Sequence, residues 1–206
     1  MIKVENVETY GWKAAIRGMR NPKNSWDMSD SAMTTLGKPW LGEKDLKLMH
    51  TLAMAGSDHG KFLRMLTITM DVTAPLYWWK EADQYRVGVV TNSCSTMHKI
   101  SSEPITQDSF QFDFTENLDM VEARKYIVNK CEEYRQKFVE TGDKEYWREL
   151  IQILPCAWMQ KRTWQLNYAV AWSIYNARKG HKLDEWRQLR GEFEKLPYFK
   201  EIFLEN

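Results

Sequence analysis

Residues 66–73, LTITMDVT, alternate between apolar and polar side chains with a period of two. Such alternation is typical of a β-strand that buries one face and turns the other toward water. The apolar positions, which we expect to share the buried face, are Leu66, Ile68, Met70 and Val72. This segment therefore requires a sheet in the fold, and residues 2–9 are expected to form a further strand.

Helical periodicity and helix-ending residues account for most of the remaining chain. Pro75 suits the first turn of a short helix, and the longest helix should begin after Thr115 or Asn117 and end near Gly142. Cys131 lies on the apolar stripe of that helix, which makes it a core residue and not a nucleophile. Further helices are expected at residues 11–19, 42–55, 144–154, 161–179 and 183–195.

These elements indicate an α+β fold that is rich in helix and contains few strands. No internal repeat, low-complexity tract or linker interrupts residues 1–206, so we expect one domain. A chain of 206 residues with 43% hydrophobic side chains is long enough to bury a sizeable core without disulfide bonds.

Charge and cysteine content narrow the classes of function. A net charge of +1 gives no reason to expect a nucleic-acid polymer or an acidic membrane as partner, whereas a single nucleotide needs only a few placed cations. The three cysteines are odd in number and widely spaced, which suits free thiols in a reducing compartment. The first residues lack the apolar region of a secretory signal, and no stretch approaches a membrane span. We therefore expect a cytoplasmic protein.

Two features are candidates for ligand binding. Residues 20–39 are rich in Asn, Ser, Asp, Gly and Pro and are expected to form a long surface loop. This loop carries Arg20 and Lys23, which suit a phosphate, although an ordinary polar connector would look the same. The ten tryptophans, Trp78, Trp79 and Trp164 among them, suit a thick core and equally suit flat ligands or subunit interfaces.

Motifs for phosphate loops, dinucleotide-binding turns, nucleophile elbows and zinc proteases do not occur, and the four histidines are too scattered for a metal site. What remains is a spacing on the helix expected at 161–179. Asn167 and Arg178 lie eleven residues apart, about 20° around a helix and roughly 16 Å along it. They could contact two ends of one long ligand. Equally, Arg178 complements the helix dipole and Asn167 is a hydrogen-bonded buried amide.

Two other segments carry groups capable of chemistry. His59 precedes the alternating strand, but it also fits the start of a helix that Ser57 or Asp58 would cap. Residues 83–99 contain a dense set of donors, and a cysteine beside a histidine can become a reactive thiolate. No pattern brings Cys94 and His98 together, so a catalytic pair is not indicated.

The order of these segments resembles the flavin-dependent thymidylate synthases, the ThyX family. MDVTAPLYWWKEADQYR has the family's strand, Ala-Pro turn, short helix and the end of its signature of Arg-His-Arg, seven residues and Ser. Arg86 stands at the last Arg of that signature and Cys94 at its Ser. Later positions follow the family's spacing without a gap: Leu154, Pro155, Trp164, Asn167 and Arg178. LDEWRQL, residues 183–189, is similar to the segment that closes the family's fold, and the resemblance covers residues 59–190.

This resemblance implies a central, mostly antiparallel sheet flanked by several helices and a homotetramer with active sites between subunits. It implies that FAD and a nucleotide, dUMP in the family, are bound, with the methylene group from folate and hydride from NADPH passing through the flavin. The protein's share of such chemistry is positioning and charge stabilisation. The site residues that it implies are His59, Arg86 and Asn167 for the cofactor and Asn92, Cys94 and Arg178 for the nucleotide.

The sequence departs from the family at several of these positions. Gln84 and Tyr85 replace the first Arg and His of the signature, and Thr96 and Ile151 replace two further Arg residues. Each lost charge-assisted contact costs about 1.5–3 kcal/mol, so dUMP binding could weaken by roughly two to four decades. A flavin enzyme acting on a pyrimidine nucleotide remains open. A non-catalytic protein that senses or sequesters a nucleotide, and a structural oligomer without ligand, remain open as well.

Overall fold

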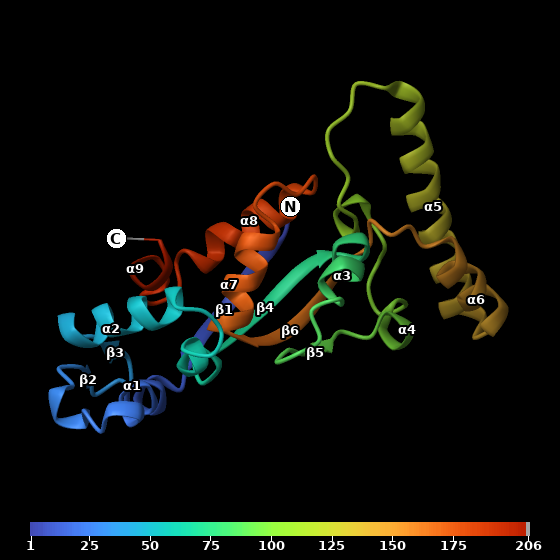
Figure 1. Cartoon of the computed structure of the whole chain (residues 1–206). Coiled ribbons are helices and arrows are strands. Elements are labelled where there is room, and N and C mark those ends of the chain that lie inside the picture. Colours follow the sequence, from blue (N-terminus) through green and yellow to red (C-terminus); the bar gives the residue numbers. More distant parts are fainter. Residues whose placement is uncertain (205–206) are drawn as a thin grey trace. The chain divides into compact units, whose positions relative to one another are not determined.

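The computed structural model describes residues 1–204. Four strands form a central antiparallel sheet in the order β1-β4-β6-β5, and β2 pairs with β3 in a separate antiparallel ribbon (Figure 1). The strands are β1 Lys3–Tyr10, β2 Ala32–Met33, β3 Pro39–Trp40, β4 Thr67–Pro75, β5 Val90–Ser93 and β6 Met159–Asn167. Together with the helices around it, this sheet confirms the α+β class.

Helices make up most of the regular structure in the described part of the chain. Four short 3₁₀ helices accompany them: η1 Asn21–Lys23, η2 Trp26–Met28, η3 Gly60–Arg64 and η4 Gln107–Ser109. The α-helices are α1 Trp12–Arg20, α2 Glu43–Met54, α3 Leu76–Ala82, α4 Thr96–Lys99, α5 Leu118–Thr141, α6 Lys144–Ile153, α7 Tyr168–Ala177, α8 Asp184–Phe193 and α9 Phe199–Phe203.

The chain divides into two compact units, each assembled from three separate stretches. Unit 1 comprises Met1–Lys3, Val72–Gln84 and Asn92–Arg162. Unit 2 comprises Val4–Asp71, Tyr85–Thr91 and Thr163–Asn206. The expectation of one domain stays a prediction.

An aromatic core holds unit 2 together. Trp12 on α1 meets Tyr168 of α7 edge to face, with ring centroids 5.4 Å apart, and Phe199 of α9 is buried beside Tyr168. The Tyr168 hydroxyl donates to the Pro197 carbonyl oxygen at 2.8 Å, and burial raises the pKa of that phenol. Gly11 begins α1 at a φ of 88°, where a Cβ would collide with the Met65 carbonyl oxygen. This contact brings α1 against η3.

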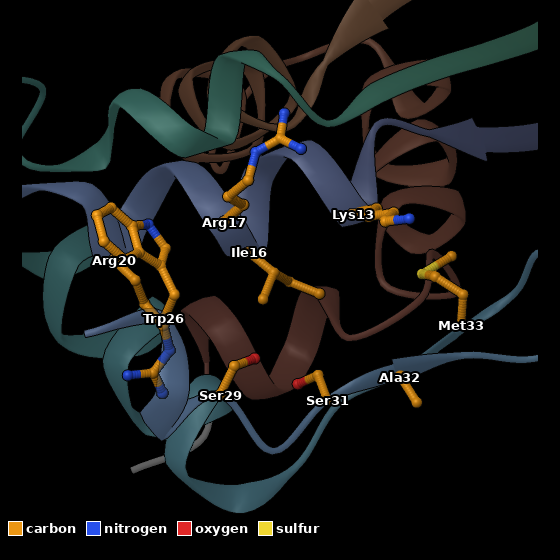
Figure 2. A pocket seen from close by; sticks show the side chains of 9 residues that line it. All are labelled: Lys13, Ile16, Arg17, Arg20, Trp26, Ser29, Ser31, Ala32 and Met33. Atoms are coloured by element: carbon orange, nitrogen blue, oxygen red, sulfur yellow. The ribbon is translucent and has the colours of Figure 1, made fainter. Parts of the chain in front are cut away.

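A buried carboxylate organises the loop that follows α1. Asp45, on α2, is fully buried and accepts from Arg20 Nε at 2.6 Å and Ser29 Oγ at 2.6 Å. The backbone N–H groups of Asp30 and Ser31 also donate to it, each at 3.2 Å. The expected loop at 20–39 is therefore a fixed structure with two 3₁₀ turns and a short ribbon, and it encloses a pocket against α1 (Figure 2).

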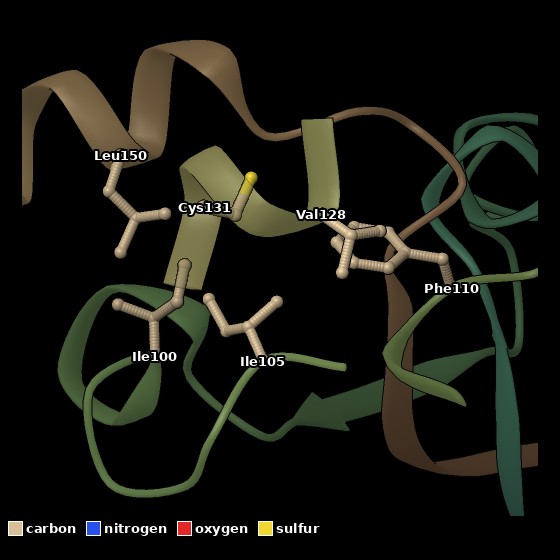
Figure 3. Packing of buried hydrophobic residues seen from close by; sticks show 6 residues of the cluster. All are labelled: Ile100, Ile105, Phe110, Val128, Cys131 and Leu150. Carbon is tan, nitrogen blue, oxygen red and sulfur yellow. The ribbon is translucent and has the colours of Figure 1, made fainter. Parts of the chain in front are cut away.

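Unit 1 has its own hydrophobic cluster, in which α5 and α6 pack side by side (Figure 3). Asn117 caps α5 by accepting from the Met120 N–H at 3.1 Å, and Gly142 ends the helix in the left-handed region, as predicted. Cys131 is fully buried, which confirms that it is a core residue, and this burial raises the pKa of its thiol to about 11. The cluster consists of Ile100, Ile105, Phe110, Val128, Cys131 and Leu150.

One predicted helix is wrong, and one open alternative does not form. The helix expected at 161–179 is strand β6 followed by α7, because Trp164 and Leu166 alternate with exposed neighbours before the helix begins at Tyr168. The alternative of a helix capped by Ser57 or Asp58 does not form: the segment is the 3₁₀ helix η3, whose N-cap is His59 without a side-chain hydrogen bond. None of the helices in the described residues is both long and apolar enough to cross a membrane.

Candidate functional site

A large pocket in unit 2, which we call the basic pocket, has a volume of about 980 Å³. Four exposed lysines line it, and Asp58 is the one carboxylate among the described residues that do so. His59 lies in the same wall, next to Lys61 of η3. The four lysines are Lys23, Lys44, Lys47 and Lys61.

Local structure explains why these cations share one cavity. Lys44 and Lys47 are three residues apart on α2 and therefore lie on one face of that helix. Lys23 ends η1, and Lys61 belongs to η3, which packs against α2. The cavity also has apolar walls, formed by side chains that include Met19, Leu48, Leu52 and Phe62.

Arg20 also lines the basic pocket, but its charge is already balanced. The side chain is 4% exposed and is paired with the buried carboxylate of Asp45. Burial tends to raise the pKa of Asp45, but hydrogen bonds from Ser29, Ser31 and Arg20 together lower it below its ordinary value. Of the two readings left open for this loop, the structure therefore does not favour Arg20 as a phosphate ligand: Arg20 holds the loop, and the four lysines supply the positive charge of the pocket.

The segment Tyr85–Thr91 lies against both ends of α7 within unit 2. At the helix N-terminus, Asn167 accepts from the Val170 N–H at 3.0 Å, and a Cβ on Gly88 would lie 2.9 Å from its amide nitrogen. At the C-terminus, Arg178 Nε donates to the Tyr85 hydroxyl at 2.9 Å. Asn167 and Arg178 thus cap opposite ends of a ten-residue helix, whereas the sequence placed both inside a longer one.

Aromatic rings orient the Arg178 guanidinium. Its central carbon lies 4.4 Å from the ring centroid of Trp186 and 5.4 Å from that of Tyr85. His181 also meets Trp186, edge to face, with centroids 6.1 Å apart. We call Tyr85, Arg178, His181 and Trp186 the Tyr85 cluster. Because a hydroxyl and two rings fix this cation, its position is set before any ligand arrives.

The structure distributes the six predicted site residues over the two units. His59, Arg86, Asn167 and Arg178 belong to unit 2, and His59 and Arg86 are exposed. Asn92 and Cys94 belong to unit 1, and both are exposed. Within unit 2, His59 lines the basic pocket, while Asn167 and Arg178 contact the segment that carries Arg86.

In unit 1, the backbone around Cys94 is held by its neighbours. The Cys94 N–H donates to the Lys161 carbonyl oxygen at 2.9 Å, and Gln160 Nε2 donates to the Cys94 carbonyl oxygen at 3.0 Å. His98 Nδ1 pairs with the Ser95 hydroxyl at 2.8 Å, so the histidine is engaged by Ser95. Among the described residues, no three His, Cys, Asp or Glu side chains group in a way that would hold a metal ion.

Some residues of these sites carry no clear signal in the sequence. Lys44 and Lys47 give none, because two lysines on an exposed helix face look like ordinary solvated charges. Tyr85 stands in the sequence as the replacement of a family histidine, and nothing in the pattern indicates that its hydroxyl accepts from Arg178. Trp78, Trp79 and Trp164 are at most 1% exposed, so these rings belong to the core and do not form a ligand surface.

No family model and no curated protein matches this sequence. Several solved structures, however, match the fold of this chain. A structure of thymidylate synthase X (ThyX) from Helicobacter pylori with FAD and dUMP matches with a TM-score of 0.75 and 17% identity, over 98% of each chain. A second structure of ThyX from that organism, also complexed with FAD and dUMP, gives a TM-score of 0.71 at 18% identity over the same shares.

A more distant likeness is to PolB, a UMP/dUMP methylase from Streptomyces cacaoi bound with 5-Br UMP. Its TM-score is 0.56 at 14% identity, over 85% of this chain and 75% of the other. These likenesses confirm the resemblance to ThyX at the level of the fold.

Proposed function

We propose that this chain is a ThyX-like nucleotide-binding protein that holds FAD in the basic pocket of unit 2. The observation that carries the proposal is the set of four exposed lysines around a cavity of about 980 Å³ that also contains His59. Two of the solved structures with this fold are complexed with FAD and dUMP, which supports the choice of ligand.

The residues of the pocket fit FAD in charge and in size. A pyrophosphate is dianionic, and lysine ammonium groups are suitable partners for its oxygens. Small-molecule pockets range from about 300 to 1,000 Å³, and this cavity lies at the upper end, as a dinucleotide requires. Leu48 and Leu52, which are partly exposed, offer apolar surface to a ring system. When bound, FAD would supply hydride transfer, while this chain's residues bind and orient it.

We further propose that Arg178 binds the phosphate of a pyrimidine nucleotide. Tyr85 and Trp186 hold its guanidinium in one orientation, and an oriented planar cation suits bidentate phosphate recognition. Arg86 and Asn167 toward the cofactor, and Asn92 and Cys94 toward the nucleotide, remain part of the proposal by resemblance. So does a homotetramer, which light scattering would test as a mass four times that of the 24.5 kDa chain.

A specific observation favours a second function, the non-catalytic nucleotide binder. Gln84 and Tyr85 stand where the ThyX signature has Arg and His, and the Tyr85 hydroxyl accepts from Arg178. Tyr85, at a position that would contact the flavin in the family, therefore orients Arg178 here, the cation that we propose binds the nucleotide phosphate. In this alternative the protein keeps a nucleotide pocket but binds no flavin, and no methyl transfer takes place.

Thermal unfolding in the presence of FAD, dUMP and UMP, together with an assay for methylated product, separates these functions. If the protein is a flavin-dependent enzyme, Tm should rise with FAD and with a pyrimidine nucleotide, and methylated product should form when folate and NADPH are added. If the protein is the non-catalytic binder, Tm should rise with nucleotide but not with FAD, and no product should form. No rise in Tm with any of these ligands would overturn both.

The Arg178→Ala variant tests where the nucleotide binds. It should abolish stabilisation by the pyrimidine nucleotide while leaving stabilisation by FAD and the circular dichroism spectrum unchanged. Lys182→Glu, which alters a nearby exposed charge, is the control and should behave like the wild type. Normal nucleotide binding by Arg178→Ala would show that the nucleotide site lies elsewhere.

A further inference from the structure

A second cavity of unit 2, which we call the α1 pocket, has a volume of about 410 Å³. It lies between α1 and residues 26–33. Figure 2 shows Lys13, Ile16 and Arg17 on the α1 side and Ser29, Ser31 and Ala32 on the opposite side. We propose that the α1 pocket binds a small planar aromatic anion, a ring system carrying a carboxylate. This site is separate from the one proposed for FAD.

The size and the apolar lining set the shape of the ligand. A volume of about 410 Å³ is near the lower end for small-molecule sites, so it suits one or two rings and excludes a dinucleotide. Trp26 is 50% exposed and lines the cavity, and its Nε1 donates to Asn21 Oδ1 at 2.8 Å. That hydrogen bond fixes the indole, which offers a ring face for stacking. Ile16 and Met33 provide further apolar surface.

The charges around the cavity indicate that the ligand carries a negative charge. Lys13 and Arg17 are four residues apart on α1, where like charges destabilise a helix. Across residues 1–204 neither makes an ion pair, and no carboxylate lines this pocket. Arg20, the third cation, is balanced by Asp45. An anion bound between Lys13 and Arg17 would relieve their repulsion.

The loop after α1 contributes different residues to the linings of the two pockets. Ser25 and Met28 line the basic pocket, whereas Trp26 and Ser29 line the α1 pocket. Because the lysines of the basic pocket do not line the α1 pocket, the proposed ligand should bind even to a variant that has lost FAD binding. Failure of one proposal is therefore distinguishable from failure of the other.

Isothermal titration of the full chain with 1-naphthoate tests the proposal. Two comparison ligands isolate the required features: 1-naphthamide keeps the rings without the charge, and cyclohexanecarboxylate keeps the charge without the aromatic ring. We expect 1-naphthoate to bind with a Kd at least about tenfold lower than either, as expected for one charge-assisted contact or one stacking contact. Equal binding of all three, or no binding of 1-naphthoate, would overturn the proposal.

Matched variants place the binding in this cavity. Arg17→Glu should weaken 1-naphthoate binding at least about tenfold, and Lys182→Glu should leave it unchanged. Trp26→Ala should weaken binding similarly, whereas Trp40→Ala, which removes another tryptophan that is about half exposed, should not. If Arg17→Glu fails to fold by circular dichroism, Arg17→Gln replaces it with the same expectation. Wild-type affinity in folded Arg17 and Trp26 variants would refute this location.

Discussion

Single residues decide how the loop after α1 is built, and Asp45 is the most consequential. Its carboxylate is fully buried and accepts from a guanidinium, a hydroxyl and two backbone N–H groups. A buried ion pair is costly to break because the remaining charge is left without a partner. Asp45 and Arg20 therefore shape the loop whose residues line both pockets.

Asp45→Asn should lower the free energy of unfolding by about 3–5 kcal/mol, because Arg20 would remain buried and unpaired. Denaturant unfolding at neutral pH measures this loss. The double variant Arg20→Met with Asp45→Leu should lose less than Asp45→Asn alone. The exposed pair of Asp184 and Arg187 is the control, since Asp184→Asn should change stability by less than about 1 kcal/mol.

The pKa of Asp45 gives the direction of the pH dependence. Because folding lowers this pKa below 3.8, the stabilisation by Asp45 is fully present above about pH 4 and is lost as the pH falls through the folded pKa. Unfolding free energies measured between pH 6 and pH 3 should fall less steeply for Asp45→Asn than for the wild type. Parallel pH profiles would contradict the role of this carboxylate.

Gly88→Ala should destabilise the protein by about 1–2 kcal/mol, because this residue has a φ of +72° and a Cβ would lie 2.9 Å from the Asn167 amide nitrogen. Gly37→Ala is a matched control, since Gly37 has the same φ with no atom near its Cβ position. The difference in unfolding free energy between these variants isolates the contact with Asn167. Equal losses would mean that the Tyr85–Thr91 segment does not press on the N-terminus of α7.

At the scale of elements, one carboxylate fastens the loop before η4 to α5. Glu132 accepts from the Ile105 N–H at 2.7 Å and from Arg135 at 2.6 and 2.7 Å. The Arg135 hydrogen bond is the main cause that lowers the pKa of Glu132 from 4.5 to about 2. This contact is therefore fully present above about pH 4.5 and is lost as the pH falls toward 2.

Glu132→Gln should loosen residues 100–110 while α5 stays formed. We expect faster amide hydrogen exchange there, with a loss of about 1–3 kcal/mol in local stability, because a charged acceptor of a buried N–H is replaced. Glu133→Gln is the control on the same helix, since its pairs with Lys130 and Lys137 are only partly buried and fasten no loop. Unchanged exchange at Ile105 in Glu132→Gln would contradict this assignment.

The elements also show what the sequence could predict. The alternation in β4 and the capping residues of α5 are local signals, and both elements form as expected. Strand β6 was missed because only Trp164 and Leu166 of its nine residues are buried, so its period of two is short and the helix beyond it dominates the pattern. The basic pocket gathers residues from three separate segments, and no local pattern reports that they meet.

At the scale of the whole molecule, the fold persists where the sequence has changed. A TM-score of 0.75 accompanies only 17% identity with a ThyX structure. By the resemblance to the ThyX signature, Gln84 and Tyr85 are departures, whereas Asn167 and Arg178 keep the spacing of that family. Under the proposed function, a phosphorylated ligand binds in the basic pocket, where lysines on α2 and η3 surround a cavity of suitable size.

The dependence of FAD affinity on ionic strength should show whether the exposed lysines bind its phosphates. Exposed lysines act through a field that salt screens, with a Debye length of about 8 Å at 0.15 M and about 3 Å at 1 M. The Kd for FAD should therefore rise severalfold between these salt concentrations, as measured by isothermal titration. An affinity independent of salt would indicate that the lysines do not contact the phosphates.

The central claim is that the basic pocket binds FAD, and equilibrium titration of flavin fluorescence with the protein tests it most directly. The wild type and Lys182→Glu should bind FAD equally, and the double variant Lys47→Glu with Lys61→Glu should bind at least about tenfold more weakly while keeping its circular dichroism spectrum. Equal affinity in all three proteins, or no binding by the wild type, would contradict the claim.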